Sequence, residues 1–545
     1  MTFRVNRLLA VPFPALHRLI GLCGLAAALG CCCAPPAAAK DALVIGHQDN
    51  TASLDPAKAY ETTPAGLLSS VVYDQLIGFA SDSMTKPIPE LAESWDVSED
   101  GMTWTFHLRQ GVKFSNGNPV NADAVVFSLR RVVKLAAEAA WMLTQFGLSE
   151  QTITKIDDQT VRLALDKPYA PTLFLAYLAL SIGSVLDPIE VMAHEQNGDM
   201  GSAWLEEHSA GSGAYAIETA VKQDRFVFLA NDAYWGGKPP WPQLVMRHIP
   251  DAMEQMALLE SGEIDIAWNL GQDETQQLAE NTDIQLVEAL WPKIYWTGMN
   301  LGYEPFAKLQ ARQAVRYAID YDGLVAHVLK GAGEVVQTFL APGLLGYAPE
   351  NRPYAYDPER AKALLAEAGY PNGFDVELDC FNFSPWVEVA QQLRHNLAQV
   401  GIRVTVNQLP PKDLFSKVSQ RTFQMTLIGW LFDYPDPDAN AKSFAHCDSL
   451  GDDATIKLRA WNMRYLLPEI SKIVEQAALE RDLDKRAAMY QQVAAQITED
   501  GPFAFLFVPV RYYGIRAEVA PYIGKPEFIA YDFPVLKFGT QPSAK

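Results

Sequence analysis

The residues best placed to do chemistry form one run, in which an apolar stretch passes directly into a group of acids. The run is Gly429-Trp430-Leu431-Phe432-Asp433-Tyr434-Pro435-Asp436-Pro437-Asp438. The apolar residues 425–430 predict a strand, and Asp433 comes just past its end. Because ligands of open α/β sheets bind at the carboxyl ends of strands, Asp433 is a candidate ligand contact. The same spacing also fits a turn in which Asp436 and Asp438 are turn formers and the acids only face solvent.

Motifs for catalysis are missing from the sequence. It holds no G-x-S-x-G nucleophile elbow, no G-x-x-x-x-G-K-[ST] phosphate loop and no H-E-x-x-H zinc motif. Asp436, Asp438 and Asn440 begin like a calcium loop, but Ala441 and Cys447 stand where glycine and glutamate are needed. We therefore expect no enzyme, no cofactor and no metal ligands. A secreted hydrolase that uses two carboxylates is the alternative from another functional class.

The N-terminal segment has the order of a secretory signal peptide. Three arginines within residues 1–18 precede an apolar run over 19–29, and three alanines at 37–39 offer a cleavage site. The apolar run is shorter than the ~20 residues that a bilayer span needs. We therefore expect residues 1–39 to be removed on export. A weak lipoprotein site that would leave the protein lipid-anchored at Cys31 is the alternative.

Composition excludes several classes of protein. The chain has 44 basic and 65 acidic residues among 545, and 49% of its residues are apolar. This balance excludes a disordered chain and a multi-span membrane protein. A formal charge of −21 repels nucleic acid, so we expect no nucleic-acid partner. Beyond the leader only Cys380 and Cys447 remain, and the sequence leaves open whether they form a disulfide.

Strands alternate with helices along the rest of the chain, which favours α/β domains with open sheets. Asn121 is expected to cap a helix that carries residues 125–133, and Gly401 to end a helix over 389–400. A further helix is expected over 311–319, and 172–185 are expected to be core. The expected strands are 42–46, 103–108, 161–165, 226–229, 374–378, one that begins at 404–406, and 425–430.

A long signature covers Leu91–Arg109, Gly111–Phe114 and Asn121–Ser128. Other segments match the same pattern in order: Ser53–Pro56, Asn231–Pro239, Leu259–Asp265, Arg312–Asp320 and Tyr356–Glu359. Together they closely resemble the family 5 extracellular solute-binding proteins of ABC importers, the peptide, dipeptide and nickel class. The resemblance covers essentially the whole chain after the leader.

The resemblance implies an α/β, bilobed periplasmic-binding-protein fold (type II, cluster C) with an extra inserted domain. Two lobes would close on a ligand about a hinge. The inserted domain is mostly scaffold in the family, so Trp95, Trp104, Phe106 and Phe114 are expected to pack it. The implied domains are a discontinuous first domain at 40–75, 207–290 and 505–545, an inserted domain at 76–206, and a third domain at 291–504.

The resemblance also implies the function. We expect a periplasmic substrate-binding protein that traps peptides (di- or oligopeptides) and delivers them to the membrane permease of an ABC importer. Its partners would be that permease and a peptide or related amine-bearing small solute, and we expect a monomer. A receptor of the same fold for nickel, haem or another non-peptide solute is the alternative.

Residues 429–433 resemble the G-W-x-x-D segment of the peptide binders, in which the Asp pairs with the ligand's α-ammonium group. A buried ammonium needs a charged partner, and Asp433 can supply it. Peptide backbone lying against the preceding strand would satisfy its own polar groups, as in strand addition. The other expected ligand contacts are Gly429, Trp430, Phe432, Tyr434, Asn382, Phe383, Thr51 and Tyr60.

The loop 380–386 departs from the pattern of some dipeptide binders. Those proteins carry an arginine near this position that clamps the ligand carboxylate. No arginine occurs here between Arg360 and Arg394. A strict dipeptide preference therefore stays open against a longer peptide, a derivatised peptide or another amine-bearing solute.

Overall fold

The protein is described by a computed structural model over residues 41–48, 53–58, 71–80 and 83–523. The predicted leader with Cys31, and the predicted ligand contacts Thr51 and Tyr60, lie outside the described residues. The chain from Asp41 onward belongs to one compact unit. Within the described ranges, no helix combines the length and apolar character that a bilayer crossing needs.

The largest sheet has the strand order β16-β15-β17-β13-β18-β11-β1-β10-β9-β8, with β12 and β14 also paired to β18. Parallel and antiparallel pairs are mixed, as in β1 with β10 and β13 with β17. Its strands are β1 (Ala42–His47), β8 (Tyr215–Val221), β9 (Arg225–Ala230), β10 (Gln243–His248), β11 (Ile266–Leu270), β12 (Ile284–Leu290), β13 (Ile294–Met299), β14 (Gly333–Val335), β15 (Asp375–Phe381), β16 (Arg403–Leu409), β17 (Met425–Trp430) and β18 (Phe503–Arg516).

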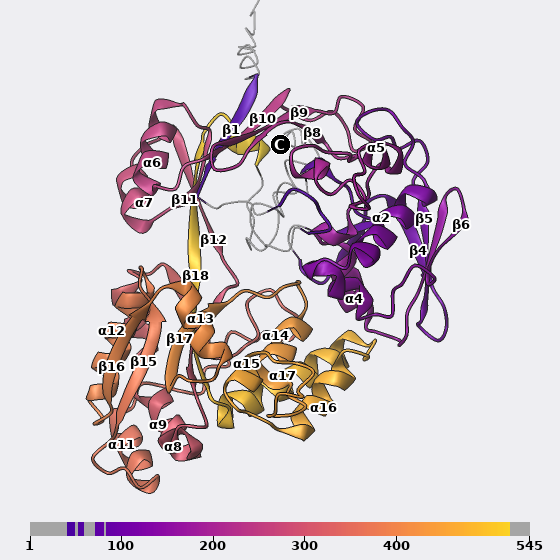
Figure 1. Ribbon diagram of the computed structural model, residues 1–545. Coiled ribbons are helices and arrows are strands. Elements are labelled where there is room, and N and C mark those ends of the chain that lie inside the picture. Colours follow the sequence, from indigo (N-terminus) through magenta and orange to yellow (C-terminus); the bar gives the residue numbers. More distant parts are fainter. Residues whose placement is uncertain (1–40, 49–52, 59–70, 81–82, 524–545) are drawn as a thin grey trace, which may run out of the picture. The chain divides into compact units, whose positions relative to one another are not determined.

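Strand β18 joins the two halves of this sheet. Its first residues pair with β13, and its last residues pair with β11 and β12. Figure 1 shows β18 in yellow, continuing from the neighbourhood of β11 to that of β17. The chain passes between the two halves a second time at 291–293, from the end of β12 to the start of β13.

A separate antiparallel sheet lies within the predicted inserted domain. Its order is β4-β5-β7-β6, built from β4 (Ala92–Val97), β5 (Thr103–Leu108), β6 (Ile153–Asp157) and β7 (Thr160–Ala164), and a small pair joins β2 (Ile77–Phe79) to β3 (Pro87–Pro89). Trp104, Phe106 and Phe114 are buried in the core, and Trp95 packs against it. The expected packing role of these aromatics is confirmed. The boundaries of the three domains stay a prediction.

Helices cover the sheets, and their starts follow local capping rules. Asn121 accepts a hydrogen bond from the Ala124 N–H at 3.1 Å, so the predicted N-cap is confirmed. The described helices include α2 (Ala122–Leu135), α3 (Trp141–Thr144), α4 (Pro171–Leu178), α5 (Pro188–Ala193), α6 (Ala252–Ser261), α7 (Gln272–Leu278), α8 (Glu304–Ala307), α9 (Leu309–Ala318), α10 (Tyr321–Gly323), α11 (Pro358–Glu367), α12 (Trp386–Ala398), α13 (Pro411–Ser419), α14 (Pro437–Ala445), α15 (Arg459–Asn462), α16 (Pro468–Ala477) and α17 (Leu483–Asp500).

The predicted elements are present, with shifts at their ends. The strands at 103–108 and 425–430 have the expected bounds, whereas the strand at 374–378 is β15 and continues to Phe381. Helix α12 ends at Ala398, three residues before Gly401, which takes a positive φ of 89°. The segment 172–185 contributes α4, whose residues are almost all buried, so its assignment to the core is confirmed.

The loop Ser53–Pro56 is anchored by a buried ion pair. The Arg131 guanidinium of α2 donates to the two carboxylate oxygens of Asp55 at 2.8 and 2.7 Å, and both side chains are fully buried. Ser202 donates a third hydrogen bond to Asp55 at 2.6 Å. The motif therefore ties the segment after β1 to α2, the helix at the end of the long signature.

Both cysteines of the described chain are free and buried. Cys380 lies in β15 and Cys447 just beyond α14, so each thiol is enclosed by its own surroundings. Burial raises the pKa of Cys380 to about 11, and the charge of Asp379 adds to it. Burial likewise raises the pKa of Cys447.

The native protein should therefore resist thiol alkylation. We expect iodoacetamide at pH 8 to leave Cys380 and Cys447 unlabelled in the folded protein, because the reactive thiolate is scarce and enclosed. Both should label in guanidinium chloride without any reductant, as read by peptide mass spectrometry. Labelling that appears only after reduction would show a disulfide.

Candidate functional site

Strand β17 ends with one backbone edge open. The parallel pairing with β15 runs from Met425 to Leu427, where Cys380 is the last partner. The antiparallel pairing with β13 on the other side continues to Gly429 and Trp430. Residues 428–430 therefore keep a strand conformation, and among the strands that the structure describes they pair on one side only. Such an edge can accept the backbone of an extended segment.

Trp430 is held in place by an amide and a guanidinium. Its Nε1–H donates to Asn440 Oδ1 at 2.9 Å, and the Asn440 amide donates to the Phe339 carbonyl at 2.7 Å. The guanidinium carbon of Arg459, at the start of α15, lies 4.7 Å from the centre of the Trp430 ring. Stacking of this kind is a cation–π contact.

Asp433 lies half-buried in an environment that contains a cation. Burial lowers the pKa of Arg459 to about 10, and the negative charge of Asp433 opposes that lowering. The charge of Asp433 also helps to raise the pKa of Tyr177, behind the larger effects of burial and of Asp438. Asp433, Arg459 and Trp430 thus form one group. The sequence gives no signal for Arg459, because α15 is a short helix with no motif.

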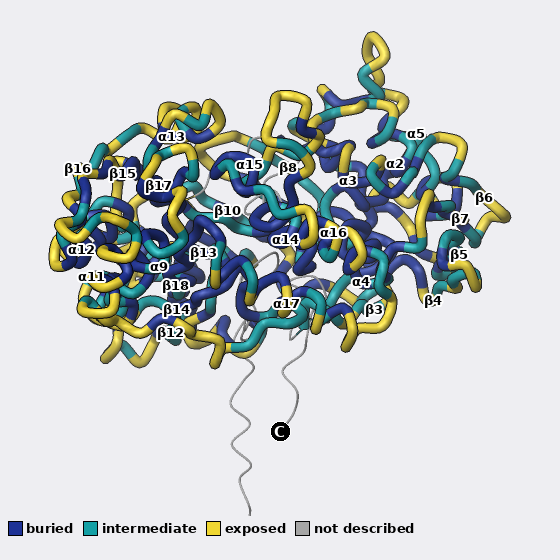
Figure 2. The backbone as a smooth tube through the Cα atoms, turned by 90° about the horizontal axis from the view of Figure 1, so that it is seen from below, coloured by how far each residue is buried: buried dark blue, intermediate teal, exposed yellow. Residues whose placement is uncertain are grey.

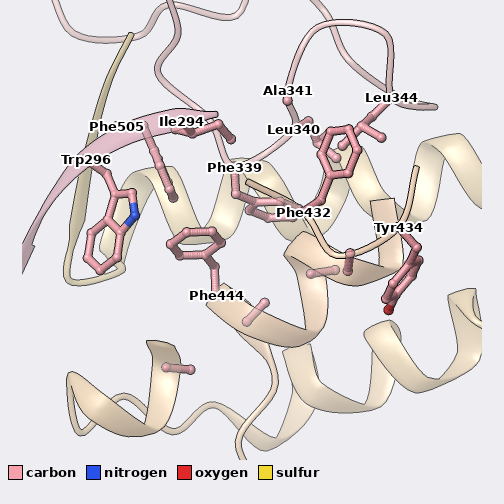
Figure 3. Packing of buried hydrophobic residues seen from close by; sticks show 14 of the residues in the cluster. Ile294, Trp296, Phe339, Leu340, Ala341, Leu344, Phe432, Tyr434, Phe444 and Phe505 are labelled. Atoms are coloured by element: carbon pink, nitrogen blue, oxygen red, sulfur yellow. The ribbon is translucent and has the colours of Figure 1, made fainter. Parts of the chain in front are cut away.

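Phe432 and Tyr434 are enclosed by the protein. Phe432 has no exposed surface, and Figure 3 shows it among core side chains that include Phe339 and Leu340. Tyr434 lies against Tyr177 of α4, with ring centres 4.1 Å apart. The structure therefore describes both as packing residues, and the ligand contacts expected of them stay predictions.

The alternative in which Asp436 and Asp438 lie in a turn and face solvent is wrong. Asp436 caps α14 and receives two hydrogen bonds of 2.7 Å from the Arg486 guanidinium of α17. Asp438 accepts a hydrogen bond from the Tyr434 hydroxyl and pairs with Lys442 Nζ, each at 2.8 Å. Both acids are buried, because α14 is enclosed along nearly its whole length, as Figure 2 shows in dark blue.

The loop after β15 contributes the remaining described candidates. Asn382 and Phe383 are exposed, and Phe383 stacks on Phe381 with ring centres 5.4 Å apart. Trp386, at the end of the same loop, is buried close to Gly429. The carboxyl ends of two neighbouring parallel strands, β15 and β17, therefore meet at this edge, as expected for a ligand site in an α/β sheet.

Comparison with known proteins identifies the class. The sequence profile of the bacterial extracellular solute-binding proteins, family 5 Middle, matches residues 86–452. The chain therefore belongs to this family, and the resemblance seen in the motifs is confirmed.

Two relatives of the chain are named for different ligands. The dipeptide-binding protein of Escherichia coli (strain K12) is 28% identical over 475 residues, covering 84% of this chain and 87% of that protein. Heme-binding protein A of Haemophilus influenzae is 28% identical over 497 residues, covering 86% and 88%.

A solved structure agrees with the fold. The ABC transporter-associated periplasmic binding protein DppA from Helicobacter pylori, in complex with peptide STSA, superposes with a TM-score of 0.72 at 26% identity. The match covers 91% of this chain and 97% of that one. The predicted α/β periplasmic-binding-protein fold is confirmed.

Loss of the Arg486 guanidinium should unfold the region around the site. We expect Arg486→Met to lower the free energy of unfolding by about 3–5 kcal/mol, because Asp436 would stay buried without its partner. The matched control is Arg403→Met, which removes an exposed, solvent-screened ion pair with Asp375 and should change the free energy of unfolding far less. Urea unfolding measures both. Equal losses for the two variants would contradict the assigned role of Arg486.

Proposed function

We propose that this protein is a periplasmic receptor that binds peptides and delivers them to the membrane permease of an ABC importer. The observation that carries the proposal is the open backbone edge of β17 at 428–430, followed directly by the carboxylate of Asp433. Membership of family 5 and the peptide complex of a structural relative support it. The protein would act as a monomer and return its ligand unchanged, so no covalent step is involved.

The strand edge at 428–430 and the carboxylate of Asp433 match two features of a peptide with a free N-terminus. These features are its polar backbone and its α-ammonium group. Main-chain N–H and C=O groups need hydrogen-bond partners when they leave water, and a strand edge offers both kinds. An α-ammonium group leaving water needs a negative partner. Since Asp433 follows the strand end by three residues, the peptide amine would lie beyond the part of the backbone that pairs with 428–430.

The guanidinium of Arg459 already lies close enough to affect Asp433. In the absence of ligand it would balance the carboxylate, so the half-buried acid is never left without a countercharge. A ligand ammonium would join this pair and make it a group of three charges. The net gain for the ligand is then smaller than for an isolated buried carboxylate.

Binding would select one arrangement of the two predicted lobes. A ligand shifts such an equilibrium only through contacts that it makes in one state and not in the other. The strand edge belongs to the predicted third domain, and the expected contacts Thr51 and Tyr60 belong to the predicted first domain. A peptide that touches both sets would favour the state in which they approach each other.

A haem receptor is the second candidate, because a haem-binding relative matches at the same 28% identity as the dipeptide-binding one. Native mass spectrometry of the protein purified from periplasm separates the two. A retained mass made of amino-acid residues supports the peptide receptor. A retained mass of haem would overturn it.

The role of Asp433 can be tested with trialanine and N-acetyl-trialanine. We expect Asp433→Ala to weaken binding of the free-amine peptide by roughly 30-fold or more, since a lost charge pair at a desolvated site costs about 2–5 kcal/mol. The acetylated peptide, which has no ammonium, should lose much less. Isothermal titration calorimetry measures both affinities.

Asp375→Ala is the control for this experiment. Asp375 is an exposed acid that pairs with Arg403 at the surface, so its removal should leave both affinities unchanged. Equal weakening of the free and acetylated peptides by Asp433→Ala would remove Asp433 from the ammonium role.

A further inference from the structure

A side chain of the predicted inserted domain packs on the residue that follows the proposed ligand contact. The ring of Tyr177, in α4, lies against the ring of Tyr434, with centres 4.1 Å apart and planes inclined by 33°. Both side chains are enclosed, with exposed fractions of 0% and 2%. Since Tyr434 comes directly after Asp433 in the chain, the inserted domain touches the neighbour of the carboxylate that is proposed to hold the peptide amine.

Polar contacts join the same two predicted domains beside this pair of rings. The Arg486 guanidinium of α17 donates to the Thr172 hydroxyl of α4 at 3.1 Å. The Ala170 N–H, just before α4, donates to the Ala478 carbonyl, just after α16, at 2.9 Å. We call these three pairs, Tyr177–Tyr434, Thr172–Arg486 and Ala170–Ala478, the α4 contact. It joins the predicted inserted domain to the predicted third domain.

The inserted domain is held to the predicted first domain by a stronger kind of contact. The Arg131 guanidinium donates to both carboxylate oxygens of Asp55, and both side chains are fully buried. Separating such a pair leaves buried charges without partners, which is strongly destabilising. In the α4 contact, by comparison, the acceptors are a hydroxyl and a carbonyl, and Arg486 keeps its charged partner Asp436 on its own side. The α4 contact therefore opens more easily.

This difference in strength indicates which interface separates when the predicted lobes move. Interfaces between domains of one chain resemble transient protein–protein interfaces, so relative motion is the default. If the inserted domain stays with the first domain, separation of the lobes opens the α4 contact and closure forms it again. A contact that exists in one state only favours that state, even where it does not touch the ligand.

We propose that Tyr177 is a positioning residue for the ligand, because its contact with Tyr434 forms when the lobes close and stabilises the closed state. The inference rests on the proposed function, in which a bound ligand closes the lobes. It gives the inserted domain, which is expected to be mostly scaffold, a part in retaining the ligand. Since Tyr177 acts through Tyr434, it slows release, and recognition of the amine is left to Asp433.

Hydroxyl-radical footprinting followed by peptide mass spectrometry tests whether the α4 contact opens. We expect Tyr177 to be oxidised in the ligand-free protein and to be protected several-fold when trialanine is added, because closure buries its ring. The control is Tyr215, a tyrosine of β8 in the first domain that is 1% exposed and should stay unreactive in both samples. Equal protection of Tyr177 with and without trialanine would show permanent packing and overturn the proposal.

Substitutions separate a positioning role from a role in folding alone. By isothermal titration calorimetry, we expect Tyr177→Leu to weaken trialanine and N-acetyl-trialanine by the same factor, roughly threefold to tenfold, as for loss of an aromatic pair. Tyr177→Phe keeps the ring and should bind both peptides as the wild type does. Tyr215→Leu also removes a buried tyrosine ring but should leave both affinities unchanged.

Two results of this titration contradict the proposal. Wild-type affinities in Tyr177→Leu would show that the ring has no part in retention. Weakening of trialanine alone would place Tyr177 in recognition of the ammonium group rather than in closure.

Thr172→Val tests the α4 contact without removing a ring, so it is informative even where Tyr177→Leu folds poorly. Valine has the shape of threonine but cannot accept the hydrogen bond from Arg486. We expect both peptides to bind more weakly and Tyr177 to be less protected in the presence of trialanine. Affinities and footprints equal to those of the wild type would count against a contact that forms on closure.

Failure of this inference is distinct from failure of the proposed function. Binding of trialanine that depends on Asp433, with no change in the oxidation of Tyr177, would overturn the role of Tyr177 alone. A protein that retains haem and does not bind trialanine would overturn the peptide receptor. Footprinting with haem in place of trialanine would then decide whether Tyr177 becomes protected on closure.

Discussion

The buried ion pair between Asp436 and Arg486 is the constraint on which the candidate site depends. Both side chains are almost fully removed from water, so each is tolerable only with the other in place. The pair fixes the first turn of α14, and Arg486 also donates to Thr172 at the start of α4. The chain between β17 and α14 is therefore held at both ends. Asp433 lies in the middle of this short segment. Because the segment is held at both ends, the carboxylate is preorganised before a ligand binds.

The second constraint is the continuity of β18. One strand takes part in both halves of the large sheet, and the segment 291–293 runs beside it. Strand β18 and the segment 291–293 are the two places at which the chain passes between the halves of the sheet. Arg511 and Lys293 lie on these two segments.

The fold leaves the ligand undecided, because relatives named for dipeptides and for haem are both 28% identical to this chain. A shared scaffold fixes where a ligand binds, whereas the side chains at the site fix what binds. In this chain the proposed peptide ligand depends on the strand edge at 428–430 and on the carboxylate of Asp433. Phe432 and Tyr434, which come just after the strand end, are both buried in packing contacts.

Local patterns along the chain predicted the family, the strand at 425–430, the N-cap at Asn121 and the position of Asp433 after a strand. Each of these depends on neighbours in the chain, where periodicity and capping are visible. Only the tertiary structure paired Asp436 with Arg486, 50 residues away, and brought Arg459 to Trp430 and Arg511 to Trp291. It also placed Cys380 and Cys447 in separate buried surroundings as free thiols. The physical reason is that a charge or a thiol finds its partner across space, and chain spacing carries no record of which distant segments the sheet brings together.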